Sequence, residues 1–228
     1  MKKIFLIAVI SLLFYSGYSQ TSFGVQVGGN FASATLKYPF LTSTLDQDNK
    51  GKIGIVAGVL AEIPFGNSIN FRPEINFVQR GFKFDETFGS IKETQEWTLN
   101  YVEISPNFVY TLPAGPGNVY FGLGPNFGLG ISGEEKTTET NQPDEKTKFK
   151  FDGENNLAST DNKYHLKAFD FGGNVLAGYK LNNGLFFTLG YNMNFFNLIE
   201  DEGYTYKNKS AISFKVGYLF GGSKASAN

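Results

Sequence analysis

A single histidine limits the catalytic chemistry open to this chain of 228 residues. His165 is the only histidine, and the sequence contains no cysteine. Thiol catalysis and metal sites that use several histidines are therefore essentially excluded, and the Gly-x-Ser-x-Gly motif of serine hydrolases does not occur. A lipid-modifying enzyme that pairs His165 with a serine and an acid stays open as a minor alternative. We expect instead a solvated histidine at the entry to a strand, and no catalytic residue, cofactor or metal site.

Two other segments carry residue types that bind ligands elsewhere. Gly122, Gly124 and Gly128 resemble a phosphate-binding loop, but their spacing is wrong and no helix pattern follows them. The segment 132–163 holds eight acids and five bases without the ordered spacing of a calcium loop. We expect the glycines to make room in a narrow interior and the segment 132–163 to be a hydrated surface loop.

Eight charged residues interrupt segments that are otherwise apolar or small. Four are acids and four are bases, so the set would be neutral if its members met in one place. Such side chains could line a water-filled path or form ion pairs with one another. Which of the two is expected depends on the secondary structure that positions them. They are Glu62, Arg72, Glu74, Arg80, Glu103, Asp170, Lys180 and Lys215.

An apolar residue at every second position is the dominant pattern after residue 20. In the run 23–31, for example, phenylalanine and valine alternate with glycine, glutamine and asparagine. This period of two is typical of β-strands, and no stretch sustains the 3.6-residue period of a helix. Eight such runs cover residues 23–31, 53–63, 69–80, 102–110, 119–131, 169–179, 185–195 and 212–220.

The connections between these runs alternate in length. The short ones are 64–68, 111–118 and 182–184, and the long polar ones are 35–50, 85–96, 132–163 and 200–208. Outer-membrane barrels have short periplasmic turns and long outer loops, and about ten residues let a tilted strand cross the bilayer. We therefore predict an all-β fold, an eight-stranded antiparallel up-and-down transmembrane β-barrel. A soluble sandwich is the alternative, but its apolar faces would point inward.

The N-terminus has the order of a secretory signal peptide. Lys2 and Lys3 precede an apolar run from Ile4 to Tyr15, and small residues follow. About twelve apolar residues are too few for a transmembrane helix. We predict a signal peptide over 1–19 with cleavage before Gln20, a barrel over 20–220 and a short tail over 221–228. The formal net charge of −1 becomes more negative when the two lysines leave, which argues against nucleic acid as a partner.

The pattern places the eight charged residues inside the predicted barrel. Eight strands leave an interior that side chains can fill, and an unpaired buried charge is very costly. We therefore favour a lumen plugged by ion pairs over a narrow water-filled pore. Because Glu74 and Glu103 should lie close together on neighbouring strands, we expect Arg72 or Lys215 to bridge them.

Five short motifs occur in order along the chain, at residues 72–81, 101–106, 121–125, 169–172 and 216–220. They resemble strands of the Bacteroidetes outer-membrane β-barrel proteins, the PorT-like or "porin family" group, and cover most of the chain after the signal peptide. The last motif is similar to the terminal aromatic strand that barrel-assembly machinery reads, here with Tyr218 and Phe220.

The sequence thus predicts an exported protein of the cell outer membrane with a structural or surface-binding role. Membrane lipid, lipopolysaccharide and the assembly machinery are the expected partners, and the long loops could contact an extracellular ligand or protein. A porin-like pore is the first alternative. A secretion-associated or gliding-associated component, which the resemblance implies for a few PorT-like members, also stays open.

Overall fold

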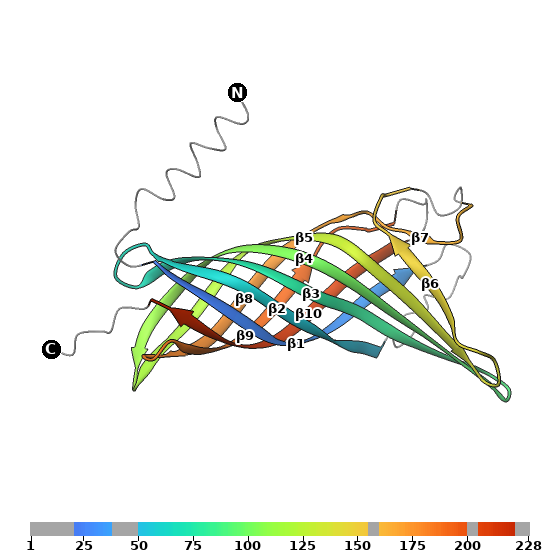
Figure 1. Ribbon diagram of the computed structural model, residues 1–228, viewed down its shortest axis with the longest axis horizontal. Helices are drawn as coiled ribbons and strands as arrows, with labels where there is room; N and C mark the ends of the chain where they lie inside the picture. The colour runs from blue at the N-terminus through green and yellow to red at the C-terminus, as the bar shows by residue number, and fades with distance from the viewer. Residues whose placement is uncertain (1–20, 38–49, 155–159, 200–204, 222–228) are drawn as a thin grey trace, which may run out of the picture.

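Eight antiparallel strands form a closed ring in the computed structural model (Figure 1), which describes residues 21–37, 50–154, 160–199 and 205–221. The ring follows chain order, and β10 returns to pair with β1, so that Phe23 lies opposite Phe220. The predicted eight-stranded barrel is confirmed, whereas the predicted signal peptide and residues 222–228 lie outside the described residues. The ring strands are β1 (Ser22–Lys37), β2 (Lys50–Pro64), β3 (Ile69–Phe88), β4 (Ile91–Ala114), β5 (Gly117–Glu139), β8 (Phe169–Leu181), β9 (Leu185–Asn194) and β10 (Thr205–Phe220).

Two short strands lie outside the ring. β6 (Glu145–Lys150) pairs with the outer part of β5, and β7 (Tyr164–His165) runs parallel to β6. Within the described ranges, no helix is both long enough and apolar enough to cross a membrane.

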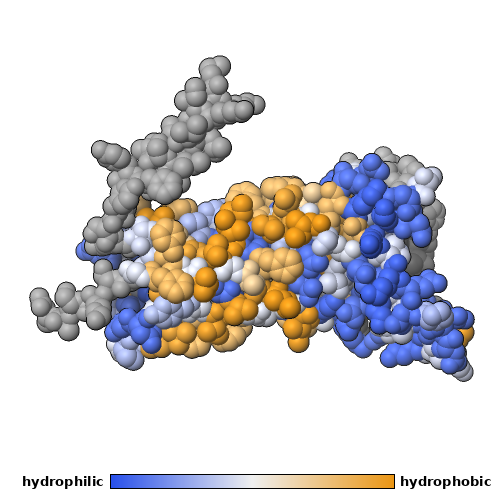
Figure 2. Space-filling model, viewed as in Figure 1, coloured by the Kyte–Doolittle hydropathy of each residue, from blue (hydrophilic) through white to orange (hydrophobic). Residues whose placement is uncertain are grey.

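The predicted division into an outward and an inward face is confirmed on all eight ring strands. Successive side chains of a strand point to opposite faces, and here the apolar set is exposed while the polar set is buried. Figure 2 shows the result as a hydrophobic band across the middle of the face in view. One exposed member from each ring strand is Val27, Ile55, Ile75, Ile104, Leu123, Val175, Leu189 and Phe214.

The strands continue well past this band at one end, which corrects two of the predicted loops. The predicted loop 85–96 is a hairpin of β3 and β4, with Phe88 paired to Ile91, and much of 132–163 is β5 and β6. We call residues 81–100 and 131–150 the outer extension. Figure 1 shows its hairpins reaching beyond the ring, and Figure 2 shows that this end is hydrophilic.

Cross-strand pairs explain why these polar segments remain strands. Glu96 lies opposite Lys83 in the β3–β4 register. Its carboxylate also contacts two lysines, at 2.6 Å from Lys83 Nζ and 2.7 Å from Lys52 Nζ. Opposite charges on facing residues of neighbouring strands stabilise a sheet. The backbone hydrogen bonds between the strands form without lipid around them. Polarity alone therefore does not mark a loop.

The predicted loop 200–208 is also shorter than expected, because β10 begins at Thr205. Of the predicted loop 35–50, the part 35–37 belongs to β1 and Lys50 to β2. Residues 38–49 and 200–204 lie outside the described residues.

Two apolar layers close the interior of the ring at different heights. The outer layer draws side chains from β1, β3, β4, β6 and β10, and it also includes Leu166 and Leu198 from connections. Trp97 of β4 and Tyr206 of β10 belong to strands that are not neighbours, yet their ring centres are 5.4 Å apart, so the layer lies across the lumen. The inner layer lies toward the short turns and consists of Leu60, Val109, Tyr120, Leu176, Phe186 and Leu219.

Candidate functional site

A belt of charged side chains lies inside the ring, most of it between the two apolar layers. It contains the eight residues that the sequence pattern singled out, and we call it the lumen belt. Seven of them are buried, and Lys180 is half-buried near the short turns. Each sits at an inward position of its strand, so the alternation of the backbone brings them together from five strands.

Glu74 is the centre of one half of the lumen belt. Its Oε2 lies 2.7 Å from Lys215 Nζ, and its Oε1 lies 3.4 Å from Arg72 Nε. The Gln26 amide also donates to Oε2 at 2.8 Å. Glu74 is 1% exposed, so its carboxylate is held by two cations and an amide away from water. Such compensation is what a buried charge requires.

Arg80 is the centre of the other half. Its guanidinium forms an ion pair with Glu103 and lies 3.8 Å from Asp170 Oδ2. Amides supply further donors, since Asn126 donates to Glu103 at 3.2 Å and Asn208 donates to Asp170 at 2.8 Å. One arginine thus neutralises part of two buried carboxylates.

The expected bridge between Glu74 and Glu103 is wrong. Glu103 does lie opposite Asn76 in the β3–β4 register, as the antiparallel arrangement predicts, but Arg80 is its partner. Arg72 instead places its guanidinium carbon 4.9 Å from the ring centre of Tyr120 and 4.6 Å from that of Phe186. The negative ring faces attract the cation, and Arg72 turns toward the inner layer, away from Glu103.

The remaining pair lies closest to the short turns, where Lys180 binds Glu62. All eight members of the lumen belt therefore have a partner of opposite charge within the belt. Three further polar partners, Gln26, Asn126 and Asn208, also point inward. Parity predicts the inward position of Gln26 and Asn126. Asn208 lies beyond a register shift between β1 and β10, where the parity of the run 212–220 no longer applies.

A small polar cavity separates the two halves of the lumen belt. Its volume is about 20 Å³, and its lining includes Glu74, Glu103 and Lys215. Such a space holds about one water molecule. Asn30 also lines it, is 3% exposed, and has side-chain atoms without a protein partner. The middle of the barrel is therefore polar but nearly filled.

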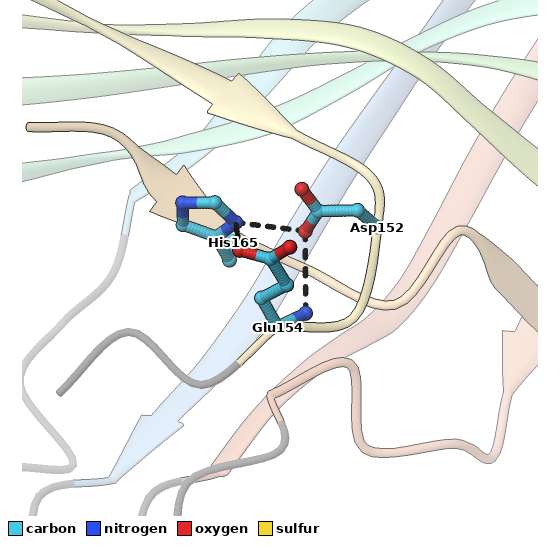
Figure 3. Close-up of side chains that lie close together, drawn as sticks. All are labelled: Asp152, Glu154 and His165. Atoms are coloured by element: carbon cyan, nitrogen blue, oxygen red, sulfur yellow. Dashed lines mark hydrogen bonds and ion pairs between the residues drawn. The ribbon is translucent and has the colours of Figure 1, made fainter. Parts of the chain in front are cut away.

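A second cluster lies where β6, β7 and the segments beside them meet (Figure 3), at the hydrophilic end of the molecule (Figure 2). His165 Nδ1 lies 2.7 Å from Asp152 Oδ1 and 3.7 Å from Glu154 Oε2. Its Nε2 lies 2.9 Å from Asp161 Oδ1. Both ring nitrogens thus face carboxylates.

The expectation of a solvated His165 is wrong, because its side chain is fully buried. The backbone holds it in place: Leu166 N donates to Lys150 O at 2.8 Å, and Gly153 N donates to Leu166 O at 3.1 Å. Leu166 itself packs in the outer layer. No periodic signal marks Asp152 or Asp161 in the sequence, so their approach to His165 could not be predicted.

The two flanking carboxylates raise the pKa of His165 above its usual 6.5, with the hydrogen bond to Asp161 the larger cause and that to Asp152 the next. A carboxylate beside each nitrogen stabilises the imidazolium form. A raised pKa in the folded state means that the stabilisation is fully present below pH 6.5 and is lost as the pH rises through the higher folded value.

We expect an NMR titration of His165 to show this shift directly. The ring signals of the lone histidine should titrate with a midpoint above 6.5 in detergent-folded, chelator-treated protein. Asp161→Asn should move the midpoint down, because it removes the larger of the two causes. A wild-type midpoint at or below 6.5 would contradict the geometry of the cluster.

The aromatic pair predicted to mark the terminal strand lies on the outer face of β10. Tyr218 and Phe220 are 41% and 54% exposed, and their ring centres are 5.1 Å apart in an edge-on arrangement. They lie opposite Val25 and Phe23 of β1. Their place at the closing seam is compatible with an assembly signal, which stays a prediction.

Solved structures similar to this chain are outer-membrane and surface proteins of bacteria. Neisserial surface protein A matches with a TM-score of 0.42 and 16% identity over 87% of this chain and 97% of its own. OprG from Pseudomonas aeruginosa matches with 0.40 and 13% over 90% and 98%. Ail from Yersinia pestis, solved with the heparin analogue sucrose octasulfate, matches with 0.35 and 12% over 88% and 99%.

Sequence comparison with curated proteins gives no match. A family model does match, and it is described as the outer membrane protein beta-barrel domain. The match covers residues 18–200, which is most of the chain and includes seven of the eight ring strands. Together with the closed ring and its apolar outer band, this match shows that the chain belongs to the outer membrane protein beta-barrel domain family.

Proposed function

We propose that this outer-membrane barrel has a structural or surface-binding role, carries out no catalysis, and is closed to solute flow. The observation that carries the proposal is the lumen belt, in which buried acids and bases pair with one another between two apolar layers. Ion pairs across the interior stabilise the ring. Contacts with other molecules must then form on its outer surface.

The filled lumen is the argument against the porin-like alternative. A conducting path needs continuous water, whereas the cavity of about 20 Å³ in the lumen belt has room for about one molecule. Tyr120 and Phe186 of the inner layer are almost fully buried, as are Leu99 and Tyr101 of the outer layer. Ions would have to displace these side chains and separate the buried pairs.

The outer extension is the surface best suited to contact a partner. β4 alone has 24 residues, whereas a tilted strand needs only about 9–11 to cross the bilayer. The extension is polar and carries charges of both signs, for example the Lys146–Glu134 pair at 2.8 Å. Exposed pairs of this kind contribute little to stability, so their side chains can exchange partners. We propose lipopolysaccharide or an extracellular ligand as that partner.

Three narrower assignments have less support. Cleavage before Gln20 and recognition of the Tyr218–Phe220 strand by assembly machinery both follow from sequence signals. The PorT-like assignment, with its link to secretion or gliding, depends on the five motifs. For the lipid-modifying enzyme, the geometry gives no specific support, because both ring nitrogens of His165 face carboxylates.

Planar-bilayer recording tests the closed lumen. We expect the folded wild-type protein to show no steady conductance, whereas a known porin in the same membranes should conduct. The double variant Arg72→Ala, Phe186→Ala removes the guanidinium and one of its flanking rings, 4.6 Å away, and should admit ions more readily. Steady wild-type channels of uniform size would contradict the proposal and favour the pore.

A further inference from the structure

We propose that His165, Asp152 and Glu154 form a binding site for a divalent transition-metal cation at the extracellular end of the barrel. One nitrogen and two carboxylate oxygens converge there, and the three ligand atoms lie within 4.8 Å of one another. Imidazole with carboxylates suits Zn²⁺ and its neighbours, whereas Ca²⁺ and Mg²⁺ prefer all-oxygen sites. The site is separate from the lumen belt and does not depend on the role proposed above.

The histidine is oriented as a metal ligand would be. Asp161 Oδ1 lies 2.9 Å from Nε2 and can accept a hydrogen bond from Nε2–H, which leaves the Nδ1 lone pair directed at Asp152 and Glu154. Ligating histidines commonly hold their second nitrogen against a carboxylate in this way. In that tautomer, Nδ1 and the Asp152 oxygen at 2.7 Å are both acceptors, so a cation must lie between them. A proton is one candidate, and a metal ion is the other.

The distribution of charge favours a divalent cation. Lys150 lies 2.6 Å and Lys163 3.4 Å from Asp161 Oδ2, so these two bases pair with the carboxylate beside Nε2. Within the described residues, the ion pairs of Asp152 and Glu154 are both with His165. Two negative charges therefore face a single imidazole, and a proton on the ring balances only one of them.

The site is also accessible and firmly held. His165 is fully buried, whereas the Asp152 and Glu154 side chains are 34% and 67% exposed. An ion could enter from the carboxylate side and keep water in its remaining positions. Metal–ligand bonds of about 2.0–2.2 Å require the carboxylates to move only slightly, because both already point toward the ring (Figure 3).

Calorimetric titration of the full mature chain, folded in detergent and stripped of metal, tests the proposal. We expect ZnCl₂ to bind at one saturable site and CaCl₂ to give no comparable signal. His165→Gln and Asp152→Asn should each weaken zinc binding at least tenfold, and Asp161→Asn by about tenfold through loss of orientation. The matched control Glu134→Gln, an exposed acid of the outer extension, should bind zinc as the wild type does.

Folding of each variant is checked by the gel shift between boiled and unboiled samples. If His165→Gln fails to fold, Glu154→Gln decides, because that side chain is 67% exposed and its removal should weaken zinc binding without harming the barrel. Absence of saturable zinc binding by the wild type would overturn the proposal and leave a proton as the cation between the acceptors. Equal affinity in the wild type and the Glu154→Gln variant would overturn it too.

Discussion

Replacing Arg80 with methionine should lower the free energy of unfolding by about 3–5 kcal/mol. Arg80 is 2% exposed and is the cation beside both Glu103 and Asp170. Its removal leaves two buried carboxylates with amide donors as their remaining partners, and methionine fills much of the volume without charge. Unfolding in guanidinium from lipid vesicles, followed by tryptophan fluorescence, measures the loss; Trp97 is the single tryptophan.

Lys215→Met is the matched comparison. Glu74 keeps Arg72 at 3.4 Å and the Gln26 amide at 2.8 Å after this change, so the loss should be smaller than for Arg80→Met. The triple variant Arg80→Met, Glu103→Gln, Asp170→Asn removes the stranded charges together with the cation and should recover most of the stability. If Arg80→Met unfolded at the same guanidinium concentration as the wild type, water would have to reach the carboxylates of the lumen belt, which would contradict a filled lumen.

Leu189→Arg should destabilise the barrel by about 2–4 kcal/mol, the cost of a charge facing lipid at mid-membrane. Leu189 is 56% exposed at the middle of β9. It lies opposite Ala177 on β8 and Phe214 on β10, within the hydrophobic band. The unfolding midpoint in lipid vesicles and the fraction of heat-modifiable protein report the effect.

Phe65→Arg provides the control at the edge of the same band. Phe65 is 72% exposed in the short turn between β2 and β3, near the interface, where an arginine costs only about 0–1 kcal/mol. A similar loss of stability for both variants would mean that the effect comes from the arginine itself and does not depend on its depth in the membrane. Normal assembly of Leu189→Arg would contradict the outward assignment of β9.

The sequence predicts the membrane part of this fold well because lipid imposes a strict pattern. A strand inside the bilayer must present apolar residues at every second position, and Leu189 and Phe214 follow that rule. Beyond the bilayer the constraint disappears, since both faces can be polar. The sequence pattern therefore predicts a loop over 91–96, although the pairing of this segment with 83–88 keeps it in the sheet.

The sequence predicts the lumen belt better than the cluster around His165, because only the lumen belt follows the alternation of a strand. Parity places Glu74, Arg80 and Glu103 in the lumen, but the choice of partner depends on how long side chains bend inside a narrow barrel. The Arg72 guanidinium lies over the rings of Tyr120 and Phe186, a contact that the sequence does not predict. His165 is harder still, because its burial depends on the pairing of β6 with β7, which spans few residues and leaves no period.

The seam between β1 and β10 has a consequence for how the chain reaches its native state. Phe23 and Phe220 are paired neighbours, although nearly all of the chain that the structure describes lies between them. Contacts of such long sequence separation slow folding, since the entropy of loop closure is lost before the contacts form. Until the seam closes, the partly formed sheet has two open edges, each able to pair with another chain. Because the ring is complete only when its last strand joins its first, every folding intermediate that lacks this seam is prone to aggregation.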